Sequence, residues 1–253
     1  MARLKTLGAA AVILAAGAST TAIAQEFEQD WAGFYAGIHA DGTAYSVDIS
    51  DPNNSFLSDH PQLSFLLGGG GVTGGYNYFL ENNLVVSGEL DWTSELAIDE
   101  FVASNADRTT GVQYDLRMTG VTQLRGRAGF VQGNALGYIT AGIAQAQTEF
   151  ETYAVDPSPP GSGPAQESCE TSNCARTTEP LLGLTVGAGM DWAFRENWVG
   201  RVEVQHMVFE SIQVPILDPS EALLCASVSQ DQCSISYQPA STSIRFGITY
   251  MFE

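Results

Sequence analysis

The sequence predicts an all-β fold, an eight-stranded antiparallel up-and-down β-barrel that spans a membrane. Eight long segments alternate between apolar and non-apolar residues with the period of two that is typical of β-strands. The connections alternate strictly between long and short, which gives four long extracellular loops and three short periplasmic turns. The 26 glycines, and the lack of an apolar run long enough for a membrane-spanning helix, also favour strands.

The last segment, residues 241–252, is expected to close the barrel. It is longer than the roughly 9–11 residues that a tilted strand needs to cross a bilayer. One of its faces is apolar and aromatic, and the other is small or polar apart from one methionine. The first face consists of Ile244, Phe246, Ile248, Tyr250 and Phe252, and the second of Arg245, Gly247, Thr249 and Met251.

Seven upstream segments provide the other strands. Their alternation is less marked in the first, second and fifth, and the sequence does not assign the faces of the fifth. Three short polar turns, at residues 81–83, 132–134 and 195–197, join the second strand to the third, the fourth to the fifth and the sixth to the seventh. The seven segments are residues 31–47, 63–79, 84–97, 112–131, 135–151, 182–194 and 198–208.

Period two alone does not tell whether the charged face of the barrel points into the lumen or into water. A soluble barrel of the lipocalin type would turn its charges outward. A membrane barrel is favoured because the non-apolar face is rich in glycine and carries both signs of charge, whereas the loops are mainly acidic. Aromatic residues near the short turns also resemble an interfacial girdle. They are Trp31, Phe34, Tyr78, Phe79, Phe130, Tyr138, Phe194, Trp198, Tyr250 and Phe252.

The N-terminus is predicted to be a signal peptide, residues 1–24, followed by a barrel domain over residues 25–253. Arg3 and Lys5 precede a short apolar run, and Ala22-Ile23-Ala24 has the pattern of a cleavage site. Export makes disulfide bonds the expected state of the cysteines. The expected pairs are Cys169–Cys174 and Cys225–Cys233, because the members of each pair are close in sequence. The alternative, a zinc site, lacks both a C-x-x-C motif and a nearby histidine.

The net charge of −19 argues against nucleic acid as a partner. The residues also suggest no catalytic, cofactor or metal site. The glycines of Gly69-x-Gly71-x-x-Gly74 match a dinucleotide motif, but a strand follows them rather than the helix that the motif requires. The three histidines, His39, His60 and His206, are far apart in sequence.

Several segments resemble the small outer-membrane β-barrel family of proteobacteria, porin-like proteins similar in architecture to the OmpA transmembrane domain. They are W-A-G-F-Y-A-G-I, G-G-G-V-T-G-G-Y-N-Y-F, L-R-G-R-A-G-F, Y-I-T-A-G-I-A, G-A-G-M-D-W-A-F and I-R-F-G-I-T-Y-M-F. The resemblance implies a location in the cell outer membrane, with outer-membrane lipid, lipopolysaccharide and the barrel-assembly machinery as partners. It also implies a monomer without a cofactor. It identifies no ligand for the loops.

The function expected from this reading is that of a structural or surface protein rather than an enzyme. Two alternatives stay open: a narrow porin for ions or small solutes, and an adhesin or ligand receptor that acts through its long acidic loops. The interior of an eight-stranded barrel is just wide enough to be filled by its own side chains, so charges there must be paired. We therefore expect an ion network that closes the lumen. Its expected members are Glu89, Asp91, Arg117, Arg125, Arg127, Asp191, Arg201, Glu203 and Arg245.

Overall fold

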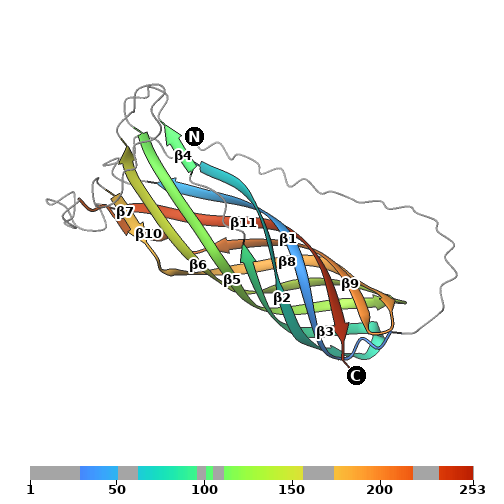
Figure 1. Ribbon diagram of the computed structural model, residues 1–253. Coiled ribbons are helices and arrows are strands. Elements are labelled where there is room, and N and C mark those ends of the chain that lie inside the picture. Colours follow the sequence, from blue (N-terminus) through green and yellow to red (C-terminus); the bar gives the residue numbers. More distant parts are fainter. Residues whose placement is uncertain are drawn as a thin grey trace, which may run out of the picture.

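The structure, a computed structural model, describes residues 29–50, 62–95, 101–104, 111–155, 174–218 and 234–252. The predicted signal peptide lies outside these residues. Eight long strands form a tilted barrel (Figure 1). They are β1 (Gly33–Ser50), β2 (Gln62–Phe79), β3 (Leu84–Glu95), β5 (Gly111–Gln132), β6 (Ala135–Val155), β8 (Pro180–Arg195), β9 (Trp198–Phe209) and β11 (Ser234–Met251).

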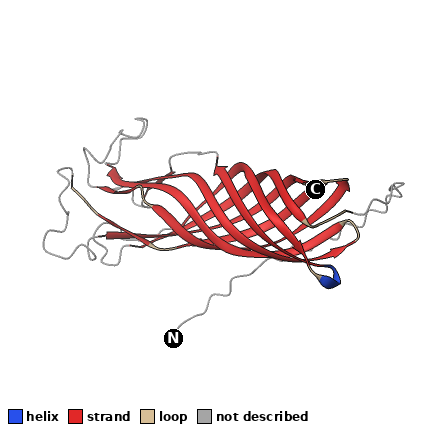
Figure 2. Cartoon of the chain, turned by 90° about the horizontal axis from the view of Figure 1, so that it is seen from below, coloured by secondary structure: helices blue, strands red, loops and turns tan. Residues whose placement is uncertain are grey.

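Each long strand pairs antiparallel with the next long strand in the chain, and β11 pairs with β1 to close the ring. This confirms the predicted all-β, eight-stranded up-and-down barrel. The three predicted short turns lie together at one end, and a 3-10 turn, η1 (Glu81–Asn83), marks that end in Figure 2. Asn82, Asn83, Gly133 and Asn197 adopt positive φ there, which asparagine and glycine tolerate best. Within the described residues, no helix is both long and apolar enough to cross a membrane.

Three short strands occur where the sequence predicted only loops. They are β4 (Phe101–Ser104), β7 (Cys174–Thr177) and β10 (Ile212–Pro215), which pair with β5, β6 and β11 respectively. The longer strands extend past their neighbours at the end of the barrel opposite the short turns. The short strands therefore cover backbone edges that would otherwise stay unpaired.

The outer face of the barrel is apolar over most of its height, with Phe34, Leu124, Ile139, Leu184 and Phe246 all more than half exposed. Such a band is what a lipid-facing barrel requires. Eight of the ten aromatic residues that were assigned to the girdle lie on this face. The prediction was wrong for Trp31 and Tyr138, which are 2% and 6% exposed and point into the barrel.

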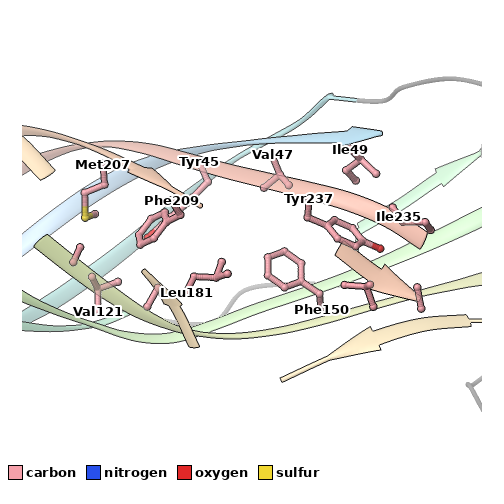
Figure 3. Close-up of a cluster of buried hydrophobic side chains, with 14 of the residues drawn as sticks. Tyr45, Val47, Ile49, Val121, Phe150, Leu181, Met207, Phe209, Ile235 and Tyr237 are labelled. Atoms are coloured by element: carbon pink, nitrogen blue, oxygen red, sulfur yellow. The ribbon is translucent and has the colours of Figure 1, made fainter. Parts of the chain in front are cut away.

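The interior holds two apolar clusters with a polar layer between them. The lower cluster lies beside the short turns and includes Trp31, which precedes β1 and fills that end of the barrel. The upper cluster lies toward the opposite end, where the ring of Phe150 packs 5.1 Å from that of Tyr237 (Figure 3). The lower cluster contains Trp31, Tyr35, Val85, Val131, Leu136, Tyr138, Ala193, Val199 and Met251. The upper cluster contains Tyr45, Val47, Ile49, Leu67, Val121, Ala144, Ala146, Phe150, Ala175, Leu181, Met207, Phe209, Val214, Ile216, Ile235 and Tyr237.

Candidate functional site

The polar layer is built from charged side chains on five strands, β3, β5, β8, β9 and β11. The strand register places residues of opposite charge directly across from each other: Glu89 is opposite Arg125, and Asp191 is opposite Arg201. Side chains directly opposite on antiparallel strands have Cβ atoms only about 4.5–5.5 Å apart. The alternation that turns these residues inward therefore also brings them into ion-pairing distance.

Each of three arginines in this layer bridges two carboxylates. Arg125 bonds both Glu89 and Glu203. Arg127 bonds Glu89 at 3.3 Å and Asp191 at 2.6 Å, and Arg201 bonds the same two carboxylates at 2.6 and 2.9 Å. Glu89 thus receives three guanidinium groups. The planar, five-donor guanidinium is suited to such bridging, whereas a lysine ammonium is a point charge.

Two tyrosines from the lower cluster complete this part of the layer. The Tyr35 hydroxyl donates to Glu89 at 2.8 Å, and the Tyr138 hydroxyl donates to Glu203 at 2.9 Å. The guanidinium carbon of Arg127 lies 3.7 Å from the centre of the Tyr138 ring, which is cation–π distance. A Cβ at Gly189 would lie 2.5 Å from the Tyr138 hydroxyl oxygen, so this glycine is needed to admit the tyrosine.

A second group of polar residues joins the layer on the side of the upper cluster. Arg245 bonds Asp91 at 3.0 Å and the Thr93 hydroxyl at 2.7 Å. The His39 ring lies 3.1 Å from Thr93 and 3.7 Å from Asp91, and its Nε2 is 4.0 Å from Asp41. The groups therefore form one continuous charged layer across the barrel.

The layer is almost free of solvent. Its charged members are between 0% and 7% exposed, and the adjoining cavity has a volume of only ≈ 10 Å³, which is about enough for one water molecule. These members are Glu89, Asp91, Arg125, Arg127, Asp191, Arg201, Glu203 and Arg245. Isolated buried charges cost several kcal/mol each, so the network explains how so many can be buried together.

The sequence analysis placed Arg117 in this network as a ninth member. A β-bulge between Met118 and Gly120 shifts the register of β5 and places Arg117 opposite Glu149, whose side chain is exposed. The prediction assumed unbroken alternation along β5, which the bulge interrupts, and the place of Arg117 in the network stays a prediction. The side chain of Arg117 itself lies outside the described residues.

Sequence reasoning missed Tyr35, Tyr138, His39 and Thr93 as members of the layer. A usable signal existed for three of them. Tyr35 and His39 share the alternation phase of Asp41 along β1, and Thr93 shares that of Glu89 and Asp91 along β3. Tyr138 was misassigned because an aromatic residue near a short turn suits the girdle as well as the interior.

Thr93, His39 and Asp91 contact one another, in the order of a nucleophile, a base and an acidic residue in a catalytic triad. The arrangement lacks room for a substrate, because the neighbouring cavity is water-sized. The Thr93 hydroxyl oxygen also accepts a hydrogen bond from Arg245.

His206 is exposed on the outer face and contacts the Thr242 hydroxyl at 3.0 Å. Over the described part of the chain, no three histidine, cysteine or acidic side chains are grouped to hold a metal ion.

Cys174 opens β7 and is disulfide-bonded. Cys169, Cys225 and Cys233 lie outside the described residues, so the pairing stays a prediction. Backbone hydrogen bonds of 2.9 and 2.8 Å connect Cys174 with Leu217, which lies just beyond β10.

We expect non-reducing peptide mapping of the exported protein to find Cys169 linked to Cys174 and Cys225 linked to Cys233. Each bond would close a short ring and stabilise the fold by roughly 2–3 kcal/mol through chain entropy. Reduction should therefore loosen the rim while the barrel stays folded. A peptide in which Cys174 is linked to Cys225 would contradict this pairing.

Comparisons with known proteins are consistent with the barrel. A family model described as the outer membrane protein beta-barrel domain matches residues 8–252. No protein of curated function matches the sequence.

Several solved structures share the architecture at low sequence identity. Outer membrane protein OprG from Pseudomonas aeruginosa is 12% identical with a TM-score of 0.48, over 87% of this chain and 97% of that chain. Neisserial surface protein A is 11% identical with a TM-score of 0.40, over 85% of this chain and 97% of that one. The outer membrane protease OmpT from Escherichia coli is 11% identical with a TM-score of 0.46, over 87% of this chain and 96% of that one. These likenesses carry no argument about function.

Proposed function

This chain belongs to the outer membrane protein β-barrel family, and from this premise we propose that it is a structural surface protein whose lumen is closed to ions and solutes. The barrel lies in the bacterial outer membrane, which it crosses with its eight long strands. The observation that carries the proposal is the buried arginine–carboxylate layer, which receives side chains from five strands and fills the cross-section of the barrel.

The two apolar clusters add barriers on either side of this layer. An ion that entered from the short-turn end would first have to displace Trp31 and its neighbours, which are nearly dry. An ion from the opposite end would meet the upper cluster. Between them it would have to separate buried ion pairs that have little water to replace the lost contacts. Each of these steps is costly, because charges in a low-dielectric interior are stabilised only by their partners.

A narrow porin would need a continuous wet path, and the cavity that adjoins the charged layer is water-sized. The proposed role is also non-enzymatic, because the Thr93–His39–Asp91 group is enclosed by the same layer. The chain would serve the outer membrane as a rigid scaffold that presents its long loops to the medium.

Exchange of residues 156–173 for a neutral linker would identify an adhesin, if cell binding were lost while the barrel stayed folded.

We expect proteoliposomes that contain the purified protein to swell no faster in solutions of small sugars and amino acids than vesicles without protein. The physical reason is that the lumen has no path wide enough for a hydrated solute. The matched control is Trp31→Gly combined with Arg127→Ala, which removes one side chain from the lower cluster and one from the charged layer. Swelling by the unmodified protein at a rate that depends on solute size would support the porin instead.

A further inference from the structure

Both faces of the barrel change character at the same height. Along β6 the outward residues are apolar up to Ile143 and then become Gln145, Gln147 and Glu149, all exposed. The inward residues change in the opposite sense: on β1 they are polar from His39 to Thr43 and apolar from Tyr45 onward. Below this height the barrel has an apolar outer face and a polar interior. Above it the outer face is polar and the interior apolar, as in a water-soluble barrel. The lipid-facing band ends where this change occurs, because exposed amides and carboxylates belong in water or among headgroups.

A hollow of ≈ 450 Å³ lies on the outer face at this boundary. It forms where β6 changes partner: β8 pairs with β6 up to Gln147, and β7 takes over at Phe150. Residues 178 and 179, between these two pairings, belong to no strand, and the Thr148 hydroxyl donates to the Glu179 carbonyl at 3.0 Å. We call this feature the rim hollow. Its described lining consists of Gln145, Gln147, Thr148, Glu149, Thr178 and Pro180.

The lining chemistry favours a neutral or cationic polyol over an anion. Two amides and two hydroxyls can both donate and accept hydrogen bonds, Glu149 accepts only, and Pro180 provides an apolar surface. The described lining contains no arginine or histidine, and the chain has no lysine beyond Lys5. The closest described arginine in sequence, Arg176, lies opposite Glu151 in the register and does not line the rim hollow. A phosphate would therefore find a carboxylate and no described cation in the rim hollow.

The position of the rim hollow indicates how its ligand is anchored. Gln145 is directly opposite Leu182 in the β6–β8 register, and Ile143 is opposite Leu184. The side chains of Leu182, Ile143 and Leu184 are 56–68% exposed and form the top of the lipid-facing band. A molecule with an acyl chain beside this band would place its headgroup in the rim hollow. The volume is also within the ~300–1,000 Å³ that is typical of small-molecule sites.

We propose that the rim hollow binds a sugar unit, a hexose or hexosamine, of the glycolipid headgroup in the outer leaflet, that is, of lipopolysaccharide. Gln147 and Glu149 bond the sugar hydroxyl or amino groups, and Pro180 packs against its apolar face. The proposal rests on the placement of the barrel in the outer membrane and not on the closed lumen. Conductance and sugar binding can therefore fail independently.

The test is isothermal titration calorimetry on the purified barrel in micelles with three probes. They are lipopolysaccharide, its glucosamine disaccharide without acyl chains, and phosphatidylglycerol as an anionic lipid without sugar. The variants Gln147→Ala and Glu149→Ala should each weaken binding of lipopolysaccharide about tenfold, the effect of one or two lost hydrogen bonds. The matched control Gln238→Ala changes an exposed glutamine on β11 outside the rim hollow and should have no effect.

Titration with the free disaccharide shows whether the rim hollow binds the sugar alone or only the sugar that is attached to the lipid. If it binds and shows the same losses in the variants, the site takes the free sugar as well as the lipid. If only lipopolysaccharide binds and the variants weaken it, the site requires the acyl anchor. The proposal is overturned if the two variants bind lipopolysaccharide like the unmodified protein, or if phosphatidylglycerol binds equally well with the same dependence on the variants.

Discussion

Replacement of Arg125 by alanine is expected to lower the free energy of unfolding of the barrel by about 3–5 kcal/mol, the cost of breaking a buried ion pair by removing one partner. Arg125 bridges Glu89 and Glu203. Glu89 would keep Arg127 and Arg201, but Glu203 would keep only the Tyr138 hydroxyl among the partners that the structure describes. A fully buried carboxylate would then have lost its cation. Equilibrium unfolding in urea with lipid vesicles measures the loss.

A matched double variant separates the unpaired charge from the loss of packing. Arg125→Met with Glu203→Gln removes both charges of the pair and keeps similar volumes. Replacement of a buried pair by groups that carry no net charge is often close to neutral, so we expect the double variant to recover most of the lost stability. Equal destabilisation by the single and the double variant would show that Arg125 acts through packing and not through the network.

The second large effect is expected at the closing strand. Tyr250→Ser combined with Phe252→Ser should prevent insertion into the outer membrane while export continues. The rings of Tyr250 and Phe252 are 5.2 Å apart, and Trp198 on β9 lies 5.2 Å from Tyr250, so the pair forms an aromatic surface at the seam. The Phe252 amide also donates to the Phe34 carbonyl at 2.8 Å, which joins the last strand to the first. We propose that the barrel-assembly machinery recognises this aromatic surface.

Loss of insertion would be seen as absence of the heat-modifiable, protease-resistant form from outer-membrane fractions. Trp192→Ser with Phe194→Ser is the control, because it removes another pair of exposed aromatic residues, 6.0 Å apart, from a strand that does not close the barrel. We expect this control to insert. If both double variants inserted normally, the aromatic surface of β11 would have no special role. If both failed, the effect would belong to girdle residues in general.

The strands could be predicted because a lipid-facing barrel imposes period-two alternation on every one of them. Phe246 and Arg245 already identify the outer and inner faces of β11, and the structure places them so, at 60% and 4% exposed. The same reasoning located the charged layer, since a face that carries Arg125, Asp191 and Glu203 must be enclosed and paired. What alternation could not show is which charges meet. That depends on the strand register and on the stagger between strands that are far apart in the ring.

Three features escaped the sequence for physical reasons. The bulge between Met118 and Gly120 changes the phase of β5, and Gly120 is the local sign of it, since a glycine inside a strand often marks a bulge. That sign is weak here because β5 also contains Gly126 and Gly129, where the alternation continues unbroken. The upper cluster was missed because the inward face was expected to be non-apolar along its whole length. Beyond the lipid-facing band, Tyr45 continues the inward phase of Asp41 and Phe209 that of Gln205, and both are apolar. The short strands such as β7 arise from edges that only the folded barrel creates, so no local propensity marks them.

The central claim is that the lumen is closed, and single-channel recording in a planar lipid bilayer tests it most directly. The unmodified protein, inserted in 1 M potassium chloride, should give no steady conductance above that of the bare bilayer. Arg125→Ala and Trp31→Gly, tested as single variants, should give at most brief, small currents. Arg125→Ala leaves both apolar clusters in place, and Trp31→Gly leaves the upper cluster and the charged network in place. A steady, ohmic conductance from the unmodified protein, of the same size in every insertion event, would contradict the closed lumen and support a narrow porin.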